Sequence, residues 1–178
     1  MKFKIHRPPH LYLDTYIYML TASTYKRNRL FNTDSKKRVL KNLLFECIDD
    51  FKFKLFAWVI LDNHYHLLFQ INKGKNLSHF VKKLHGKSAI DLNKVDSYKG
   101  RKVWYQYWDR CVRNERGFWR SFNYIHYNPV KHGYTNKMEK YYFSSYNRYL
   151  KNRSEKWLNN RLKQYPIVDY IDSEDKNF

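Results

Sequence analysis

The chain has 178 residues, a length that fits one domain with a sizeable core and a terminal appendage. Lys and Arg number 35 against 16 Asp and Glu, a formal charge of +19, so a polyanionic partner is favoured and nucleic acid is the first candidate. Only Cys47 and Cys111 are present, far apart, which excludes a disulfide framework and a thiolate zinc site. The basic first ten residues lack an apolar run, so we expect no signal peptide, no membrane contact and a cytoplasmic location.

The first half of the chain predicts a strand, a helix and a hairpin. Residues 11–25 alternate roughly in Tyr, Ile, Thr and Leu, which predicts a strand ending in a basic loop. Asp34 is the expected N-cap of a helix whose apolar side chains recur at helical spacing, at Leu40, Leu44, Cys47, Ile48 and Phe51. Residues 53–60 and 64–71 are rich in β-forming side chains and flank a turn at Asp62 and Asn63, so they predict a hairpin.

The second half predicts a helix, a strand and another helix. Apolar side chains recur at Leu77, Phe80, Val81, Leu84 and Leu92 in an otherwise basic segment, which is typical of an amphipathic helix. Residues 103–112 predict a fourth strand, and residues 115–127 predict a helix. That helix is expected to close at Asn128, because Pro129 disfavours α conformation in the residue before it, and Gly133 permits a sharp turn.

The order of these elements predicts the fold class. A βαββαβ order followed by a helix is typical of a ferredoxin-like α+β fold, an antiparallel sheet with helices on one face, plus a C-terminal helix. Beyond residue 134 we expect an aromatic, Ser-rich stretch at 141–149, a short helix at 154–165 and a mobile acidic tail at 169–175. The predicted organisation is a main domain at 1–150 and a C-terminal helical extension with the acidic tail at 151–178.

A pair of histidines begins the second hairpin strand. His64 and His66 are spaced i, i+2, so their side chains point to the same face of a strand and could chelate a metal. The alternative, two histidines with a packing or surface role, is common for such a pair. With Asn128 as a third, oxygen ligand, the donor set suits Mg²⁺ or Mn²⁺ held together with a phosphate rather than a structural zinc.

A candidate nucleophile lies sixty residues later. Tyr124 and Asn128 are spaced i, i+4 and share a helix face, so a phenol and an amide oxygen could both reach a metal held by the histidines. One of 17 tyrosines is more often a core residue, and Tyr127 is a competing phenol. A phenol with a pKa near 10 needs a metal or a basic neighbour such as Lys131 to attack phosphorus.

Basic segments flank both motifs. Charge runs are usually solvated faces, but two of them border the candidate site in a chain that is basic throughout, so phosphate contact is the better interpretation. The predicted DNA-binding side chains are Lys26, Arg27, Arg29, Lys82, Lys83, Lys87, Arg101, Lys102 and Lys131.

These segments together resemble a known family. Residues 57–66, with Asp62-Asn63-His64-Tyr65-His66, residues 103–114, and the run Tyr124-Ile125-His126-Tyr127-Asn128-Pro129 are similar to REP-associated tyrosine transposases. These are single-tyrosine transposases of the His-hydrophobe-His nuclease superfamily, and the likeness extends from about residue 11 to 149. Two departures are Tyr65 between the histidines and Asp62-Asn63 in place of the usual lead-in; neither removes a catalytic group.

The resemblance implies a function and roles for the site residues. It implies a ferredoxin-like catalytic domain that binds hairpin-forming single-stranded DNA of palindromic repeats, in the nucleoid. One strand would be cleaved by tyrosine attack, leaving a 5′-phosphotyrosine link and a free 3′-hydroxyl that can rejoin another strand. Matched residue by residue, His64 and His66 fall on the metal pair, Tyr124 on the nucleophile and Asn128 on the polar ligand.

Two alternatives stay open from the sequence. One is a domesticated protein that binds repeat DNA without strand transfer. The other is a metal-dependent hydrolase that uses water, with Tyr124 in the core. A covalent protein–DNA adduct distinguishes the transposase from both. Whether the chain is a monomer or a homodimer also stays open.

Overall fold

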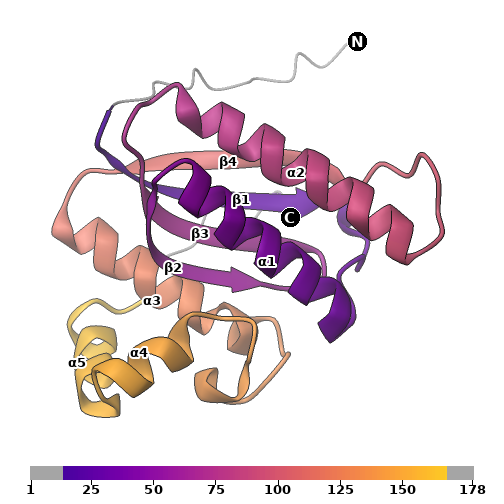
Figure 1. Cartoon of the computed structure of the whole chain (residues 1–178). Helices are drawn as coiled ribbons and strands as arrows, with labels where there is room; N and C mark the ends of the chain where they lie inside the picture. Colours follow the sequence, from indigo (N-terminus) through magenta and orange to yellow (C-terminus); the bar gives the residue numbers. More distant parts are fainter. Residues whose placement is uncertain (1–13, 168–178) are drawn as a thin grey trace, which may run out of the picture.

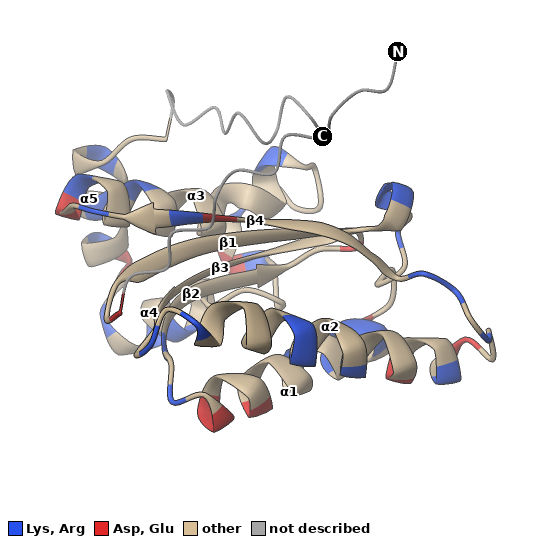
Figure 2. Ribbon diagram, turned by 90° about the horizontal axis from the view of Figure 1, so that it is seen from above, with Lys and Arg blue, Asp and Glu red and all other residues tan. Residues whose placement is uncertain are grey.

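The computed structural model describes residues 14–167, which form one four-stranded antiparallel sheet with helices on both faces. The strands are β1 (Ile17–Thr24), β2 (Lys54–Ile60), β3 (His64–Gln70) and β4 (Trp104–Val112), in the order β2-β3-β1-β4. Helices α1 (Asp34–Asp50) and α2 (Asn76–Val95) cover one face, and α3 (Glu115–Lys131) lies on the other (Figures 1 and 2). The predicted ferredoxin-like order is confirmed, with the third helix on the opposite face.

Strand β3, one of the two inner strands, is buried on both faces: one face carries aromatic core side chains and the other carries the two histidines. On the side of α1 and α2, Phe69 packs with Phe80 and Phe53, with ring centroids 5.5 Å apart in each pair. Side chains alternate along a strand, so His64 and His66 point to the face covered by α3. The core side of the sheet thus stabilises the strand, and the other side presents its histidines.

Two helix boundaries differ from those expected. The N-cap of α1 is Thr33, whose hydroxyl accepts from Lys36 N (3.4 Å), and Asp34 is the first helical residue. Helix α3 continues through Asn128 and Pro129 to Lys131, so the predicted end at Asn128 is wrong. A proline removes one amide donor but leaves the later ones, and His132 N still donates to Asn128 O at 3.0 Å. Gly133, at φ +70°, then makes the expected turn.

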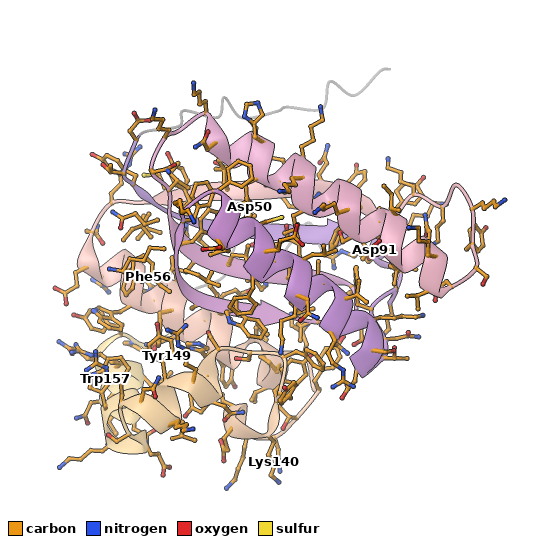
Figure 3. The ribbon with its side chains drawn as sticks, viewed as in Figure 1. Asp50, Phe56, Asp91, Lys140, Tyr149 and Trp157 are labelled. Atoms are coloured by element: carbon orange, nitrogen blue, oxygen red, sulfur yellow. The ribbon has the colours of Figure 1, made fainter. Side chains whose placement is uncertain are left out.

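The C-terminal segment packs against α3 and the β2 edge of the sheet. It contains a short 3₁₀ helix, η2 (Met138–Lys140), then α4 (Tyr146–Asn152), which the sequence pattern did not predict, and α5 (Glu155–Gln164), which it did. Tyr149 and Trp157 stack 6.2 Å apart, and the Tyr149 hydroxyl donates to Phe56 O (Figure 3). Asn123 of α3 donates to two carbonyls at the end of α5. The predicted acidic tail, residues 169–175, lies outside the described residues.

Candidate active site

The β2–β3 hairpin places two imidazoles side by side on the α3 face of the sheet. The ring centroids of His64 and His66 are 5.1 Å apart. His66 is 1% exposed, and its Nδ1 lies 2.8 Å from the hydroxyl oxygen of Thr21, the residue opposite it on β1. Burial, together with His64, His132 and Lys131, lowers the pKa of His66 well below its ordinary value. His66 is therefore a neutral imidazole at physiological pH.

The buried edge of His66 is oriented as a ligand would need. With Nδ1 engaged by Thr21, the other nitrogen, Nε2, has no hydrogen-bond partner within residues 14–167. An unpaired buried nitrogen is costly unless something binds it. A hydroxyl can donate to or accept from an imidazole nitrogen; when Thr21 accepts from Nδ1–H, the lone pair of the ring lies on Nε2. In that tautomer Nε2 of His66 is available to bind a metal ion.

His64 and Asn128 approach each other in a way that also fits a shared cation. Asn63 Nδ2 donates to Arg27 O (3.3 Å), and this bond sets the orientation of the Asn63 amide. The amide oxygen, Oδ1, then accepts from His64 Nδ1 (2.7 Å). In the neutral ring this leaves a lone pair on His64 Nε2, which faces Asn128 Oδ1 at 3.2 Å. Two acceptors at this distance are favourable when a cation lies beside both. Asn128 Nδ2, fully buried, has no hydrogen-bond partner in the described part of the chain.

The donor set defines which metal would fit. Two imidazole nitrogens and one amide oxygen suit a hard or borderline divalent cation that keeps open positions for phosphate oxygens. Within residues 14–167 no group of three His, Cys, Asp or Glu side chains is arranged to hold a metal. The candidate ligand set of His64, His66 and Asn128 contains only two side chains of these types, and its third donor is an amide oxygen.

Helix α3 brings a phenol to the histidines. Tyr124 is 2% exposed, and its ring packs edge-on against His66 with centroids 5.4 Å apart. Lys131 donates to the Tyr124 hydroxyl (3.4 Å) and places its ammonium 4.9 Å from the ring centroid. Tyr127 is exposed on another side of the helix. The i, i+4 spacing thus brings Tyr124 and Asn128, rather than Tyr127, to the two histidines.

A cavity of about 250 Å³ opens beside the histidines and is walled by cations. It is lined by both imidazoles, by Arg27 and Arg29 of the loop after β1, and by His132 and Tyr134 after α3. His132 lies next to His64, with ring centroids 5.0 Å apart. A cavity that combines nitrogen donors with two guanidinium groups is suited to a phosphate bound together with a cation.

Asp62 holds one wall of this cavity in place. Its carboxylate is 5% exposed and bonds Arg29 through Nε (2.9 Å) and Nη2 (2.8 Å), and Lys37 Nζ of α1 (2.7 Å). The guanidinium of Arg29 also lies 5.4 Å from the Tyr134 ring centroid. Asp62 therefore links α1, the basic loop and the turn that precedes His64.

The nine predicted DNA-binding side chains fall in four places. Arg27 and Arg29 line the cavity and Lys131 contacts Tyr124, whereas Lys26 and Lys102 lie beside Tyr25 at the adjacent edge of the sheet. Arg101, just before β4, pairs with Asp96. Lys82, Lys83 and Lys87 are on α2, on the other face of the sheet, where Lys83 pairs with Asp50 and Lys87 with Glu46 (Asp50 is labelled in Figure 3). The structure thus gathers the first group at the candidate site and separates it from the lysines of α2.

Five residues of the site were not identified from the sequence as functional. Thr21, Asn63 and Asp62 orient the histidines or the basic loop, and His132 and Tyr134 line the cavity. Asn63 and Asp62 precede His64 directly, so their position was a usable signal, although the sequence indicated only a turn. Thr21 faces His66 through strand pairing, which leaves no local signal in the sequence.

The comparisons with known proteins agree with this geometry. A family model described as "Transposase IS200 like" matches residues 13–114, more than half of the chain. The chain belongs to this family. The matched range contains both histidines and Asp62 but ends before Tyr124 and Asn128.

Two curated relatives support the more specific resemblance. A Haemophilus influenzae protein, provisionally described as a REP-associated tyrosine transposase, is 26% identical over 146 residues, covering 76% of this chain and 82% of that protein. The Escherichia coli REP-associated tyrosine transposase is 24% identical over 124 residues, covering 69% of this chain and 71% of that one. The resemblance to REP-associated tyrosine transposases is confirmed.

A solved structure shares the fold. It is a REP-associated tyrosine transposase bound to a REP hairpin, and it superposes with a TM-score of 0.71 at 21% identity, covering 83% of this chain and 87% of that one. In addition, no helix within residues 14–167 is long and apolar enough to span a bilayer.

Proposed function

We propose that this protein binds hairpin-forming single-stranded DNA and cleaves and rejoins one strand through a 5′-phosphotyrosine intermediate, with Tyr124 as the nucleophile. The observation that carries the proposal is the contact between the Tyr124 ring and His66, which brings the phenol to the two histidines and Asn128. Membership of the transposase family supports a DNA-processing activity. The hairpin bound by the structural neighbour supports the class of substrate.

The phosphate would be held in the cavity beside the histidines. Arg27 and Arg29 offer guanidinium donors there, and Asp62 restricts the orientation of Arg29, so less side-chain freedom is lost when a phosphate binds. His64, His66 and Asn128 would hold Mg²⁺ or Mn²⁺, which supplies Lewis-acid polarisation of the scissile phosphate when it is bound.

Tyr124 and Lys131 would carry the transfer itself. The phenol oxygen forms a bond to phosphorus, the bond from phosphorus to the 3′-oxygen breaks, the phenol proton passes to solvent, and the leaving 3′-oxygen takes up a proton. Lys131 donates to the phenol oxygen, so its ammonium stabilises negative charge on that atom as the proton leaves. One phosphodiester-type bond replaces another, so the reverse attack by a 3′-hydroxyl needs no external energy source.

A denaturing gel with labelled hairpin DNA and Mg²⁺ or Mn²⁺ tests the proposal. We expect a covalent protein–DNA band from the wild type and from Tyr127→Phe, and none from Tyr124→Phe, which removes a single oxygen and should still fold and bind. A band from Tyr124→Phe that is lost in Tyr127→Phe would transfer the role to Tyr127. Nicking without any adduct would favour a water-using hydrolase, and binding without nicking would favour a domesticated repeat-binding protein.

A further inference from the structure

A second and larger cavity, of about 530 Å³, lies beside the candidate active site and is lined by aromatic and basic side chains. It is formed by the end of β1, the 3₁₀ helix η1 (Tyr25–Arg27) and β4. Its main lining side chains are Tyr25, Lys26, Arg27, Tyr105, Gln106 and Trp108. None of the described residues that line it is acidic. We refer to it as the aromatic groove.

The aromatic groove is on the same face of the sheet as the two histidines. Strand pairing sets His66 opposite Thr21, and Thr21 opposite Trp108. Directly paired residues on neighbouring strands share a face, so the histidines and Trp108 are separated by two strand spacings, roughly 10 Å. Helix α3 packs mainly on β2 and β3 and meets β4 at Arg110, whose guanidinium donates to Ser121, so the groove lies along the other part of β4, from Tyr105 to Trp108. Arg27 lines both cavities and therefore marks the border between them.

The rings of the groove are arranged to accept a flat, electron-rich partner. Tyr105 is 49% exposed, and its ring centroid is 6.3 Å from that of Tyr25, with the planes inclined at 52°. Lys102 places its ammonium 4.7 Å from the Tyr25 centroid and 5.6 Å from the Tyr105 centroid. Aromatic side chains beside cations are the combination with which proteins bind unpaired bases and their phosphates. The Gln106 amide adds a donor and an acceptor that could bond a base edge.

The backbone at the border of the groove is strained. Lys26 and Arg27 both have a positive φ, 53° and 55°, although neither is glycine. Side chains with a Cβ rarely adopt this conformation, and it persists only where neighbouring contacts hold it. Here Tyr25 N donates to Val103 O (2.7 Å), and Asn63 Nδ2 donates to Arg27 O (3.3 Å). The same Asn63 that orients His64 thus also holds the basic border, which couples the groove to the histidines.

We propose that the aromatic groove binds an unpaired nucleobase of the cleaved strand, in the nucleotide next to the scissile phosphate. This inference rests on the proposed function, since it needs a phosphate of that strand in the neighbouring cavity. The base stacks on Tyr25 and Tyr105, and Arg27 and Lys26 contact the backbone that joins the two sites. A free phosphate alone would make no use of three rings, and an apolar peptide would make none of the cations.

The test uses a DNA hairpin with unpaired arms in which the nucleotide on either side of the cleaved bond is 2-aminopurine, a fluorescent base. In one arm we expect the fluorescence to be quenched when the wild-type protein binds. Tyr25→Leu/Tyr105→Leu should abolish the quenching and weaken binding by about tenfold or more. The matched control is Tyr142→Leu, another exposed tyrosine with a lysine, Lys41, 5.1 Å from its ring, and it should behave as wild type.

An abasic nucleotide at the same position separates a lost stack from a damaged fold. It should weaken binding to the wild type but cause no further loss in Tyr25→Leu/Tyr105→Leu. Tyr25→Phe/Tyr105→Phe keeps the rings and should restore quenching. Quenching that survives in the leucine variant, or an abasic effect that is equal in both proteins, would overturn the inference. Adducts formed by the leucine variant on short arms would still support Tyr124, so the two proposals can fail separately.

Discussion

The buried carboxylate of Asp62 should be required for folding, and Asp62→Asn tests this with little change in size. Lys37 is 6% exposed, and its ammonium is 2.7 Å from Asp62 Oδ1. Removing one partner of a buried ion pair leaves an uncompensated charge, which costs about 3–5 kcal/mol. For a chain of this length each kcal/mol lowers Tm by roughly 2–4 °C, so we expect a decrease of roughly 6–20 °C.

Two further variants show which pair matters. The side chain of Arg29 is 67% exposed and its charge stays solvated when the pair is broken, and Lys37 still neutralises Asp62, so Arg29→Gln should be much less destabilising than Asp62→Asn. Lys37→Met in the Asp62→Asn background removes the stranded ammonium and should recover most of the loss, because no unpaired charge remains.

The measurement is urea unfolding without DNA, followed by circular dichroism, with the free energy of unfolding extrapolated to water. The backbone bonds of Asp62, from Phe31 N and to the Tyr134 hydroxyl, are unaffected by the asparagine, so the change isolates the carboxylate. The reasoning would be refuted if Asp62→Asn lost less than about 1 kcal/mol, or if the double variant were as unstable as the single one.

Three other predictions concern the metal, pH and DNA. Thr21→Val removes the hydroxyl bonded to His66 and should weaken metal binding about 10–100-fold, measured by calorimetry with Mn²⁺. His66→Ala should abolish metal binding and cleavage but keep most of the affinity for the hairpin. An unchanged Mn²⁺ affinity in Thr21→Val would contradict the ligand assignment. His85 is stacked on Trp104 and hydrogen-bonded to Tyr65, and burial lowers its pKa to about 3. Between about pH 6.5 and pH 3 this histidine is therefore protonated in the unfolded chain but neutral in the folded one. The free energy of unfolding falls over this range as the pH drops, by up to about 1.4 kcal/mol per pH unit. Burial also lowers the pKa of His126 and His66, so His85→Gln should make this slope shallower without removing it, and His79→Gln, at an exposed site on the same helix, should leave it unchanged. Equal slopes in the wild type and His85→Gln would show that His85 does not contribute. Lys26→Gln/Arg27→Gln should reduce the affinity for the hairpin, and the dependence of that affinity on salt, more than Lys82→Gln/Lys83→Gln/Lys87→Gln does. The reason is that Lys83 and Lys87 pair with carboxylates of α1 on the other face of the sheet. A larger effect of the α2 variant in a salt titration would place the DNA on α2.

The sequence by itself determined the local parts of the fold and site. Strand and helix periods act over a few residues, so His64 and His66 could be assigned to one face of a strand, and Tyr124 and Asn128 to one face of a helix. The order of elements then restricted the topology to the ferredoxin-like arrangement. Helix ends were predicted less accurately: Thr33, not Asp34, caps α1, and the hydrogen bonds after Pro129 outweighed the local effect of the proline on α3.

Only the tertiary structure decided which distant side chains meet. Thr21 faces His66 because β1 pairs with β3 in one register, and a shift by a single residue would turn Thr21 to the other face. Asp62 collects Arg29 and Lys37 from two other segments, and the lysines of α2 are separated from the site by the thickness of the sheet. These contacts join residues far apart in the chain, and packing of the whole domain sets their distances, so no local pattern in the sequence records them.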